Sequence, residues 1–203
     1  MVKRLFDVVA AAALLVVTSP LLAAGALAVR LDSPGPVLYH GVRVGRNGRT
    51  FAILKLRTMV WAPQAQGRSI TVAGDSRVTR VGHLLRRSKL DELPQFVNVL
   101  KGEMSLVGPR PEDPEWVQSY SADQRRLLRV RPGVTSPASV AFADEERLLA
   151  GPDWKSSYRD VVLPAKLAIE LAYLDRRTFW TDLGVLTRTL SAGVAGRRRS
   201  RPR

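Results

Sequence analysis

The distribution of apolar residues separates a long uncharged run near the N-terminus from a mixed remainder. Val8 to Val29 form 22 consecutive uncharged residues, most of them apolar, and charged residues flank the run on both sides. About 20 apolar residues are enough for a helix to cross the hydrocarbon core of a bilayer. The pattern therefore predicts a membrane-inserted helix within residues 1–31.

Thr18, Ser19 and Pro20 interrupt this run. Pro20 has no backbone N–H and clashes with the preceding turn, so we expect a kink there, with the Ser19 and Thr18 hydroxyls donating to the freed carbonyls. A kinked spanning helix and a re-entrant helix both fit this pattern. A signal peptide is a third interpretation, because basic residues precede the run and Ala26-Leu27-Ala28 resembles a cleavage site. The length of the run and the break at Pro20 count against a signal peptide.

A β-hairpin is predicted after the apolar run. Residues 37–39 and 42–44 have the pattern of short extended segments, and residues 51–56 have that of a returning strand. Between them lies Gly45-Arg46-Asn47-Gly48, in which Asn47 and Gly48 favour the positive φ of a tight turn.

Short helices are predicted for most of the remaining chain. Thr79 to Arg87 begins one helix, and Pro94 begins another because proline is tolerated only in a first turn. Further helices are expected over residues 115–120, 123–130 and 163–177 and from residue 180 onward. Residues 131–135 are expected to form a turn. The chain is thus predicted to be an α/β protein, mostly α-helical with one short hairpin or small sheet.

Three of these helices carry specific expectations. Glu112, Asp113 and Glu115 are expected in the first turn of the helix near Pro114, where acids complement the helix dipole. Five residues should be core: Tyr158, Leu163, Leu167, Leu171 and Leu174. In the last helix, Leu183, Leu186 and Leu190 form one apolar stripe preceded by Phe179 and Trp180. That helix is expected to pack on the domain, although a position in the headgroup plane is an alternative.

Composition limits the possible chemistry. The 203 residues include no cysteine and two histidines, which excludes disulfides and thiolate metal sites. Lys and Arg number 32 against 18 Asp and Glu, giving a formal charge of +14. Such an excess indicates a polyanionic partner: nucleic acid, anionic lipid or a phosphorylated substrate.

The adjacent carboxylates Asp91 and Glu92 are the main candidates for chemistry. They precede the helix that begins near Pro94, where free N–H groups and the helix dipole favour ionised acids. Capping is the simpler interpretation, because Ser88 and Asp91 have the spacing of a capping box. However, basic residues precede the pair, and Arg110 follows between Pro109 and Pro111. An arginine stiffened in this way is suited to binding phosphate.

The run from Leu90 to Pro111, LDELPQFVNVLKGEMSLVGPRP, resembles the core motif of the bacterial sugar transferases, the small monotopic phosphoglycosyl transferases. Residues 55–59 (KLRTM) are similar to the family's KFRTM segment, and residues 79–87 also resemble it. Arg131 begins an R-x-G-[IV]-T segment, in which the family's arginine faces the substrate phosphates. The sequence after it departs from many members and continues to an acidic stretch, Asp144-Glu145-Glu146, which leaves the sugar open.

The resemblance implies transfer of a sugar 1-phosphate from a UDP-sugar to polyprenyl (undecaprenyl) phosphate, with release of UMP. Asp91 would be the nucleophile that forms a covalent sugar-phosphate intermediate. Glu92 would position Asp91 or a Mg²⁺ ion that both acids bind. Four cationic residues would hold phosphates: Lys55, Arg57, Arg110 and Arg131. Lys55 is a candidate partner of Glu92 as well.

The resemblance also implies a topology. In the family a Ser-Pro break, here Ser19-Pro20, folds the membrane helix back on itself, which favours the re-entrant form. Residues 32–196 would then be a catalytic domain at the cytoplasmic face of the bacterial inner membrane. Residues 197–203 are expected to be a disordered basic tail. Residues 61–75 are expected to form a loop, which either closes over substrate or simply connects two elements.

Two other functions compete with this one. The charge favours a nucleic-acid-binding protein, but no helix-turn-helix, zinc or RNP signature accompanies it, and no nucleic-acid partner is expected. A membrane-anchored assembly factor without activity is the second, and the intact acids and Arg110 count against it. The donor sugar, lipid length, pathway and oligomeric state are left open by the sequence.

Overall fold

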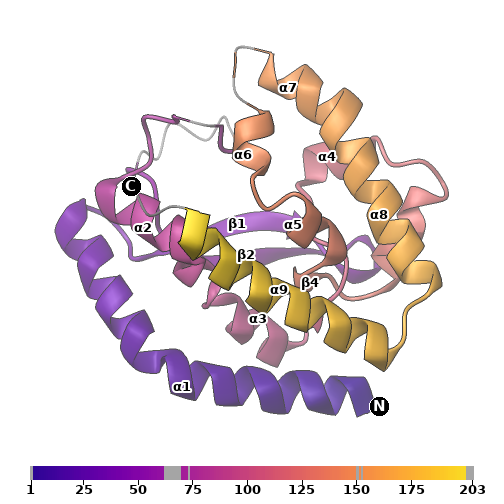
Figure 1. Cartoon of the computed structure of the whole chain (residues 1–203), viewed down its shortest axis with the longest axis horizontal. Coiled ribbons are helices and arrows are strands. Elements are labelled where there is room, and N and C mark those ends of the chain that lie inside the picture. Colours follow the sequence, from indigo (N-terminus) through magenta and orange to yellow (C-terminus); the bar gives the residue numbers. More distant parts are fainter. Residues whose placement is uncertain (1, 62–69, 73, 150, 152, 200–203) are drawn as a thin grey trace.

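The computed structural model describes residues 2–61, 70–72, 74–149, 151 and 153–199. Short helices surround a central two-stranded sheet, and α1 extends along one side of the molecule (Figure 1). The elements in order are α1 (Val2–Asp32), β1 (Leu38–Val44), η1 (Arg46–Gly48), β2 (Thr50–Leu56), α2 (Arg80–Ser88), η2 (Leu90–Glu92), α3 (Gln95–Lys101), β3 (Ser105–Val107), α4 (Pro114–Gln118), η3 (Gln124–Arg129), β4 (Gly133–Thr135), α5 (Pro137–Ala141), α6 (Glu145–Leu148), α7 (Trp154–Ser157), the π-helical η4 (Tyr158–Val162), α8 (Leu163–Asp175) and α9 (Phe179–Arg199). This arrangement confirms the predicted mostly helical α/β class.

The predicted hairpin is confirmed. Strands β1 and β2 pair antiparallel, from Leu38 opposite Leu56 to Val44 opposite Thr50. Asn47 and Gly48 at the turn have φ of 59° and 74°. The turn residues therefore set the register that points Lys55 toward the candidate site.

A second, parallel pair of strands was not predicted. Strand β3 pairs with β4, with Ser105 opposite Gly133 and Val107 opposite Thr135. The prediction that residues 131–135 form only a turn was wrong. Each strand has three residues, which is too short for an alternating pattern to be recognised. A Cβ at Gly133 would lie 2.2 Å from the Gly108 nitrogen, so the close approach requires glycine.

Helix α1 is one continuous helix that bends part-way along its length (Figure 1). At the break, Ser19 Oγ donates to the Val16 carbonyl at 2.8 Å, which Pro20 cannot reach with an N–H, and Thr18 Oγ1 donates to the Leu14 carbonyl at 2.6 Å. The predicted hydroxyl substitution is thus confirmed for Ser19, whereas the Leu14 carbonyl that Thr18 bonds is not one that Pro20 frees. Separate arms of a folded-back hairpin are not seen.

Both ends of α1 are attached to the same domain. Near its start, Lys3 pairs with Asp182 of α9, and Asp7 accepts hydrogen bonds from the Ser105 hydroxyl and the Leu106 N–H of β3. At its end, Asp32 accepts from the N–H of Val81 in α2 at 3.2 Å. Two separate contacts therefore place both ends of α1 on the same body.

Most of the helix between these ends is uncovered. Among the described residues, α1 is the single helix long and apolar enough to cross a membrane. Its most apolar 18-residue segment has a mean hydropathy of 2.2, and 6% of that segment is buried inside the protein. Val16 and Val17 at the bend are 73% and 75% exposed. A core helix of a soluble domain would be covered, so α1 needs another apolar environment.

The C-terminal helices match the predictions only in part. Helix α8 and its expected core residues pack into one hydrophobic cluster with Trp116 and Tyr120. Helix α9 buries Val185, but Trp180 and Leu190 are 75% and 72% exposed, so the predicted stripe does not pack as a whole on the domain. Helix α9 continues through Arg199, so it includes residues 197–199 of the segment expected to be disordered; residues 200–203 lie outside the described residues.

The segment that was predicted as a loop falls mostly outside the described residues, which omit 62–69 and 73. Its base is closed by an antiparallel bridge between Met59 and Val78 and by the Val60 N–H, which donates to the Arg77 carbonyl. The loop therefore begins and ends beside α2.

Candidate active site

Glu92 lies between two cations from distant parts of the chain. Its Oε1 accepts from Lys55 Nζ at 2.8 Å and from Arg110 Nη2 at 3.1 Å. Strand β2 supplies Lys55, η2 supplies Glu92, and Arg110 follows β3. The predicted pairing of Lys55 with Glu92 is confirmed, and the structure brings Arg110 to the same carboxylate.

The charges of this cluster shift the pKa values of its members. Burial raises the pKa of Glu92, but the charges of Lys55, Arg110 and Lys89 outweigh burial, so the pKa lies well below its ordinary value. The charge of Glu92 raises the pKa of Arg110 further. Glu92 and Arg110 are therefore ionised at neutral pH, and their ion pair lies next to Asp91.

Asp91 is nearly inaccessible in this structure, at 6% exposure. Burial raises its pKa above the ordinary value and the charge of Glu92 raises it further, although the charges of Lys55, Lys89 and Arg86 favour the ionised form. Its Oδ1 is buried and has no hydrogen-bond partner among the described residues. This oxygen has unused acceptor capacity and cations around it, but it must become exposed before a metal ion or an electrophile can reach it.

The backbone around Asp91 is fixed by close packing. Lys89 takes φ of 57° between α2 and η2, and the chain then turns directly into α3. Leu90 packs against Val29 of α1, Leu56 of β2 and Leu85 of α2. Gly82 permits this assembly, because a Cβ there would lie 2.0 Å from the Thr58 carbonyl oxygen. The end of the apolar helix α1 thus lies against the turn that carries Asp91.

The capping interpretation is wrong for Ser88. Its hydroxyl donates to the carbonyls of Leu84 and Leu85, at the C-terminal end of α2, and not toward α3. Asp91 and Glu92 do lie just before α3, as predicted, but Glu92 uses its carboxylate for the two cations. The carboxylate of Glu92 therefore serves as an ion-pair partner and not as a cap.

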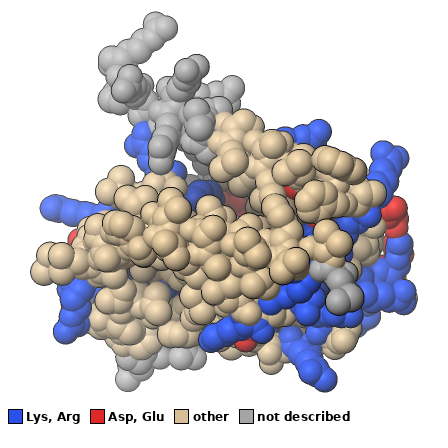
Figure 2. All heavy atoms as spheres, turned by 90° about the horizontal axis from the view of Figure 1, so that it is seen from below, with Lys and Arg blue, Asp and Glu red and all other residues tan. Residues whose placement is uncertain are grey.

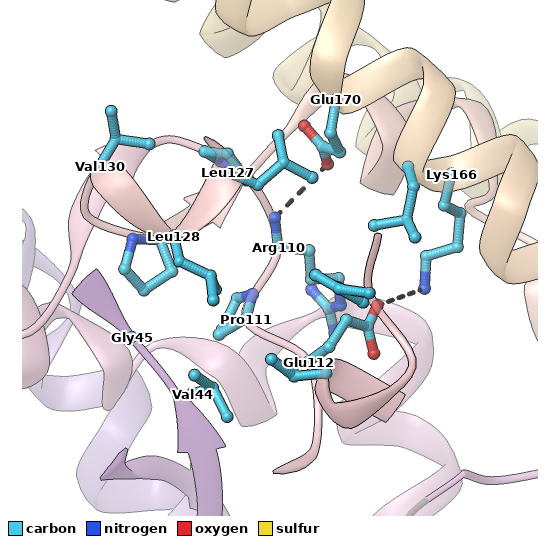
Figure 3. A pocket seen from close by; sticks show the side chains of 15 residues that line it. Val44, Gly45, Arg110, Pro111, Glu112, Leu127, Leu128, Val130, Lys166 and Glu170 are labelled. Carbon is cyan, nitrogen blue, oxygen red and sulfur yellow. Dashed lines mark hydrogen bonds and ion pairs between the residues drawn. The ribbon is translucent and has the colours of Figure 1, made fainter. Parts of the chain in front are cut away.

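Side chains of α8 contact the segment that contains Arg110 at two points (Figure 3). The N–H of Arg110 donates to Glu170 Oε1 at 3.4 Å, and two residues later Glu112 pairs with Lys166 Nζ at 3.0 Å. Tyr158 also donates its hydroxyl to Glu112 at 2.9 Å. The prediction that Glu112 complements a helix dipole was therefore wrong: its carboxylate faces inward to a buried lysine. Asp113 pairs with Arg43 instead of capping α4.

Lys166 and Glu170 were missed by the sequence reasoning. They are 4% and 3% exposed and lie one turn apart on α8. The sequence did contain a signal for them. Lys166 and Glu170 have opposite charges, lie four residues apart, and fall on the same helix face as Leu163 and Leu167, which a soluble helix normally keeps apolar.

Arg57 lies outside the Glu92 cluster. It is 4% exposed, and its guanidinium donates to the carbonyls of Val29, Ser33 and Pro34 at the end of α1. Burial lowers its pKa, and the charge of Arg30 lowers it further. This placement gives Arg57 the role of holding the end of α1 and leaves the predicted phosphate contact unsupported.

Arg131 also lies apart from that cluster. Its Nε donates to the Gly102 carbonyl at 2.8 Å, at the C-terminal end of α3. Burial lowers the pKa of Arg131, and the charges of Arg4 and Arg46 lower it further, whereas the charge of Asp7 raises it. The predicted substrate-binding residues therefore separate into Lys55 and Arg110, which meet at Glu92, and Arg57 and Arg131, which do not.

Comparison with known proteins agrees with this geometry. A family model described as "Bacterial sugar transferase" matches residues 1–196. This chain belongs to the bacterial sugar transferase family. The match includes residues 2–32 of α1 and both acids of the candidate site, so the predicted resemblance is confirmed.

Individual relatives have related names. The chain is 41% identical over 191 residues to the UDP-glucose:undecaprenyl-phosphate glucose-1-phosphate transferase of Caulobacter vibrioides, covering 93% of this chain and 68% of that protein. It is 35% identical over 203 residues to a UDP-N-acetylgalactosamine-undecaprenyl-phosphate N-acetylgalactosaminephosphotransferase of Aeromonas hydrophila, covering 96% and 44%. A relative of the first type from Escherichia coli is 32% identical over 205 residues, covering 97% and 41%.

These relatives differ in length and in the sugar that their names give. The chain spans about two thirds of the Caulobacter protein and less than half of the other two. All three names include undecaprenyl phosphate, whereas the sugars are glucose and N-acetylgalactosamine. Membership in the family therefore does not by itself assign the donor sugar.

Proposed function

We propose that this protein transfers a sugar 1-phosphate from a UDP-sugar to undecaprenyl phosphate and releases UMP. The contact that carries the proposal is the pairing of Glu92 with Lys55 and Arg110 next to the buried Asp91. Family membership and the names of the relatives support the same reaction. This would be the first membrane step in making a surface glycoconjugate.

Asp91 would act as the nucleophile. Its carboxylate oxygen attacks the phosphorus bonded to the sugar, the bond from that phosphorus to the bridging oxygen breaks, and UMP leaves with the electron pair. An oxygen of undecaprenyl phosphate then attacks the same phosphorus and releases the Asp91 carboxylate. Each displacement exchanges one P–O bond for another, so one small site serves two unlike substrates in turn.

Arg110 and Lys55 would neutralise the donor phosphates. Each contacts Oε1 of Glu92 and keeps further N–H donors for other oxygens. Arg110 can present a planar fork to a diphosphate, whereas Lys55 acts as a point charge. Glu92 would hold both cations beside Asp91, so that the charge developing on the phosphate oxygens meets donors already in place.

The donor set also fits a Mg²⁺ ion. Asp91 Oδ1 is a buried oxygen without a donor, and Glu92 is the adjacent carboxylate. Among the described residues no three acidic or histidine side chains gather into a metal site, so donor phosphate oxygens would have to complete the shell. When bound, Mg²⁺ would neutralise charge on the transferred phosphoryl group.

The membrane placement of the site follows from α1. Lys3 and Asp7 at one end and Asp32 at the other bond to the same domain, which supports a helix that enters and leaves a bilayer on one side. Figure 2 shows the face that α1 covers, with uncharged residues across its centre and Lys and Arg along its margins. We infer a re-entrant helix at the cytoplasmic face, where UDP-sugars are found.

The test is a UMP-release assay with a panel of UDP-sugars, Mg²⁺ and undecaprenyl phosphate in detergent or vesicles. With donor but no acceptor, intact-protein mass spectrometry should show a sugar-phosphate adduct on the wild-type chain. Asp91→Asn should form no adduct while its circular dichroism matches that of the wild type. Near-normal turnover by Asp91→Asn would remove it from the nucleophile role, and no UMP release with any donor would favour an assembly factor.

A further inference from the structure

Helix α8 reaches the segment around Arg110 at two points. Glu170 Oε1 accepts from the Arg110 N–H, and Lys166 Nζ pairs with Glu112 Oε1. Both side chains point from α8 toward residues 110–112 in Figure 3. Since Lys166 also bonds Tyr158 Oη and pairs with Glu145, each at 3.2 Å, the lysine itself is firmly placed. The chain on both sides of the Pro111 ring is thus fixed to one rigid helix.

Glu170 is the less expected member of the pair. It is 3% exposed, and its Oε2 is buried without a hydrogen-bond partner among the described residues. It lines a small pocket with Arg110, Pro111 and apolar side chains such as Leu127. A leucine or glutamine would fill this place at lower cost, because a buried carboxylate without enough donors is destabilising.

We propose that Glu170 is a positioning residue: it holds the backbone of Arg110 while Glu92 holds the guanidinium, so that the arginine is set for the donor phosphates. The inference rests on the proposed function, since it assigns Arg110 to those phosphates. Pro109 and Pro111 leave the segment few other conformations, and the Gly133 N–H fixes the Pro109 carbonyl at 2.9 Å. A small shift of α8 would therefore move Arg110 together with Pro109 and Pro111.

The ionisation of Glu170 adds a dependence on pH. Burial raises its pKa to about 7, against hydrogen bonds from Ser136 and the Arg110 N–H and the charge of Lys166. The other charged group facing it is Glu112, which raises the pKa, and Tyr120 lies close enough to be affected by Glu170 in turn. Above pH 7 the group that accepts from the Arg110 N–H, at 3.4 Å, is a charged carboxylate, whereas below pH 7 it is a neutral acid and a weaker acceptor.

The effect of pH on stability has the opposite direction. Between its ordinary value of 4.5 and about 7, Glu170 keeps a proton in the folded protein that it loses in the unfolded chain. Stability therefore falls as pH rises through this window. Replacing the acid by a neutral isostere should remove this loss, so the positioning role and a merely structural role predict different outcomes.

The experiment compares Glu170→Gln with the wild type from pH 6 to 9, using initial rates of UMP release, UDP binding by calorimetry, and thermal unfolding. At pH 8 we expect kcat/KM to fall roughly tenfold, as for a misplaced phosphate contact, and UDP to bind more weakly. The difference should shrink below pH 7, where the wild-type acid is protonated as well. The Tm of the variant at pH 8 should equal or exceed that of the wild type.

Two further variants keep the test decisive. Glu170→Asp keeps the charge but withdraws it from the Arg110 N–H, so it should show the same loss in rate. Asp182→Asn is the matched control, because it neutralises a buried helical carboxylate that bonds Tyr173 and Lys3 and not Arg110. It should lower Tm and leave the pH profile unchanged.

The outcomes are distinct. A wild-type protein that neither binds UDP nor releases UMP would overturn both the proposed function and this inference. An active wild type matched by Glu170→Gln and Glu170→Asp at every pH would overturn the positioning role alone. A lower Tm for Glu170→Gln, with a pH profile parallel to that of the wild type, would also overturn it by assigning Glu170 to stability.

Discussion

At the scale of single residues, Glu92 pairs with two cations, and the proposed function gives it a role in the reaction as well. Replacing it by glutamine leaves Lys55 and Arg110 facing each other without a negative charge between them. We expect Glu92→Gln to lower the free energy of unfolding at pH 7 by about 2 kcal/mol, as for a lost charged hydrogen bond, and UMP release to fall about 100-fold. Chemical denaturation and the UMP assay measure the two effects.

The lowered pKa of Glu92 gives this prediction a pH dependence. Its stabilising charge is fully present above the ordinary pKa of 4.5 and is lost as pH falls toward the folded-state value, so the stability difference should shrink in acid. Glu146→Gln is the control, since the pair of Glu146 with Arg86 is about half exposed on the Glu146 side and should be worth at most about 1 kcal/mol. Equal stability of Glu92→Gln and wild type at pH 7 would contradict the pairing.

Arg57 and Arg131 offer a second prediction at this scale. Arg57→Met removes the donor from three carbonyls at the end of α1, so unfolding should become easier by about 3 kcal/mol. Arg131→Met removes one such contact and should cost less. Thermal and chemical unfolding of both variants test this order. A raised KM for the donor in an undestabilised Arg57→Met would instead restore Arg57 as a phosphate ligand.

At the scale of elements, the sequence predicted those features that depend on residues close together in the chain. Asn47 and Gly48 identified the hairpin turn, Thr79 caps α2 with its hydroxyl, and Ser19 bonds the carbonyl freed by Pro20. The parallel strands and the positions of Glu112 and Arg57 were missed, because each depends on partners 23 or more residues away. A run of basic residues identifies candidates for binding phosphate, but only packing decides which of them face substrate.

The bend of α1 gives a prediction for the element itself. Because the chain has no native cysteine, single cysteines report cleanly on topology. Val2→Cys and Arg49→Cys, both at exposed sites, should react with a membrane-impermeant thiol reagent from the same side of sealed vesicles, and Val17→Cys from neither. Pro20→Ala should straighten the helix and change the side from which position 2 is labelled, whereas Ser19→Ala should not. Labelling of positions 2 and 49 from opposite sides would contradict a re-entrant helix.

At the scale of the whole molecule, α1 is both a membrane element and part of the fold. Ala11 and Val29 are buried against the domain, and Asp7 bonds two groups of β3. Removing residues 1–31 would therefore take away core contacts together with the membrane contact, and loss of activity would not identify the cause. The exposed face near the bend can be changed alone, because Val16 and Val17 touch solvent in this structure.

Membrane attachment can therefore be separated from folding by a double substitution, Val16→Asp with Val17→Asp. Charges at this depth are expensive to place in hydrocarbon, at about 3 kcal/mol each, while the folded domain should tolerate them. The wild type should stay with vesicles in 1 M salt, since apolar insertion is not screened, and the double variant should be released. Its Tm in detergent should stay near that of the wild type. With a soluble donor it should still form the Asp91 adduct and release one equivalent of UMP, while transfer to undecaprenyl phosphate in vesicles fails. Release of the wild type by salt alone would show that the +14 charge, and not α1, holds the protein at the membrane.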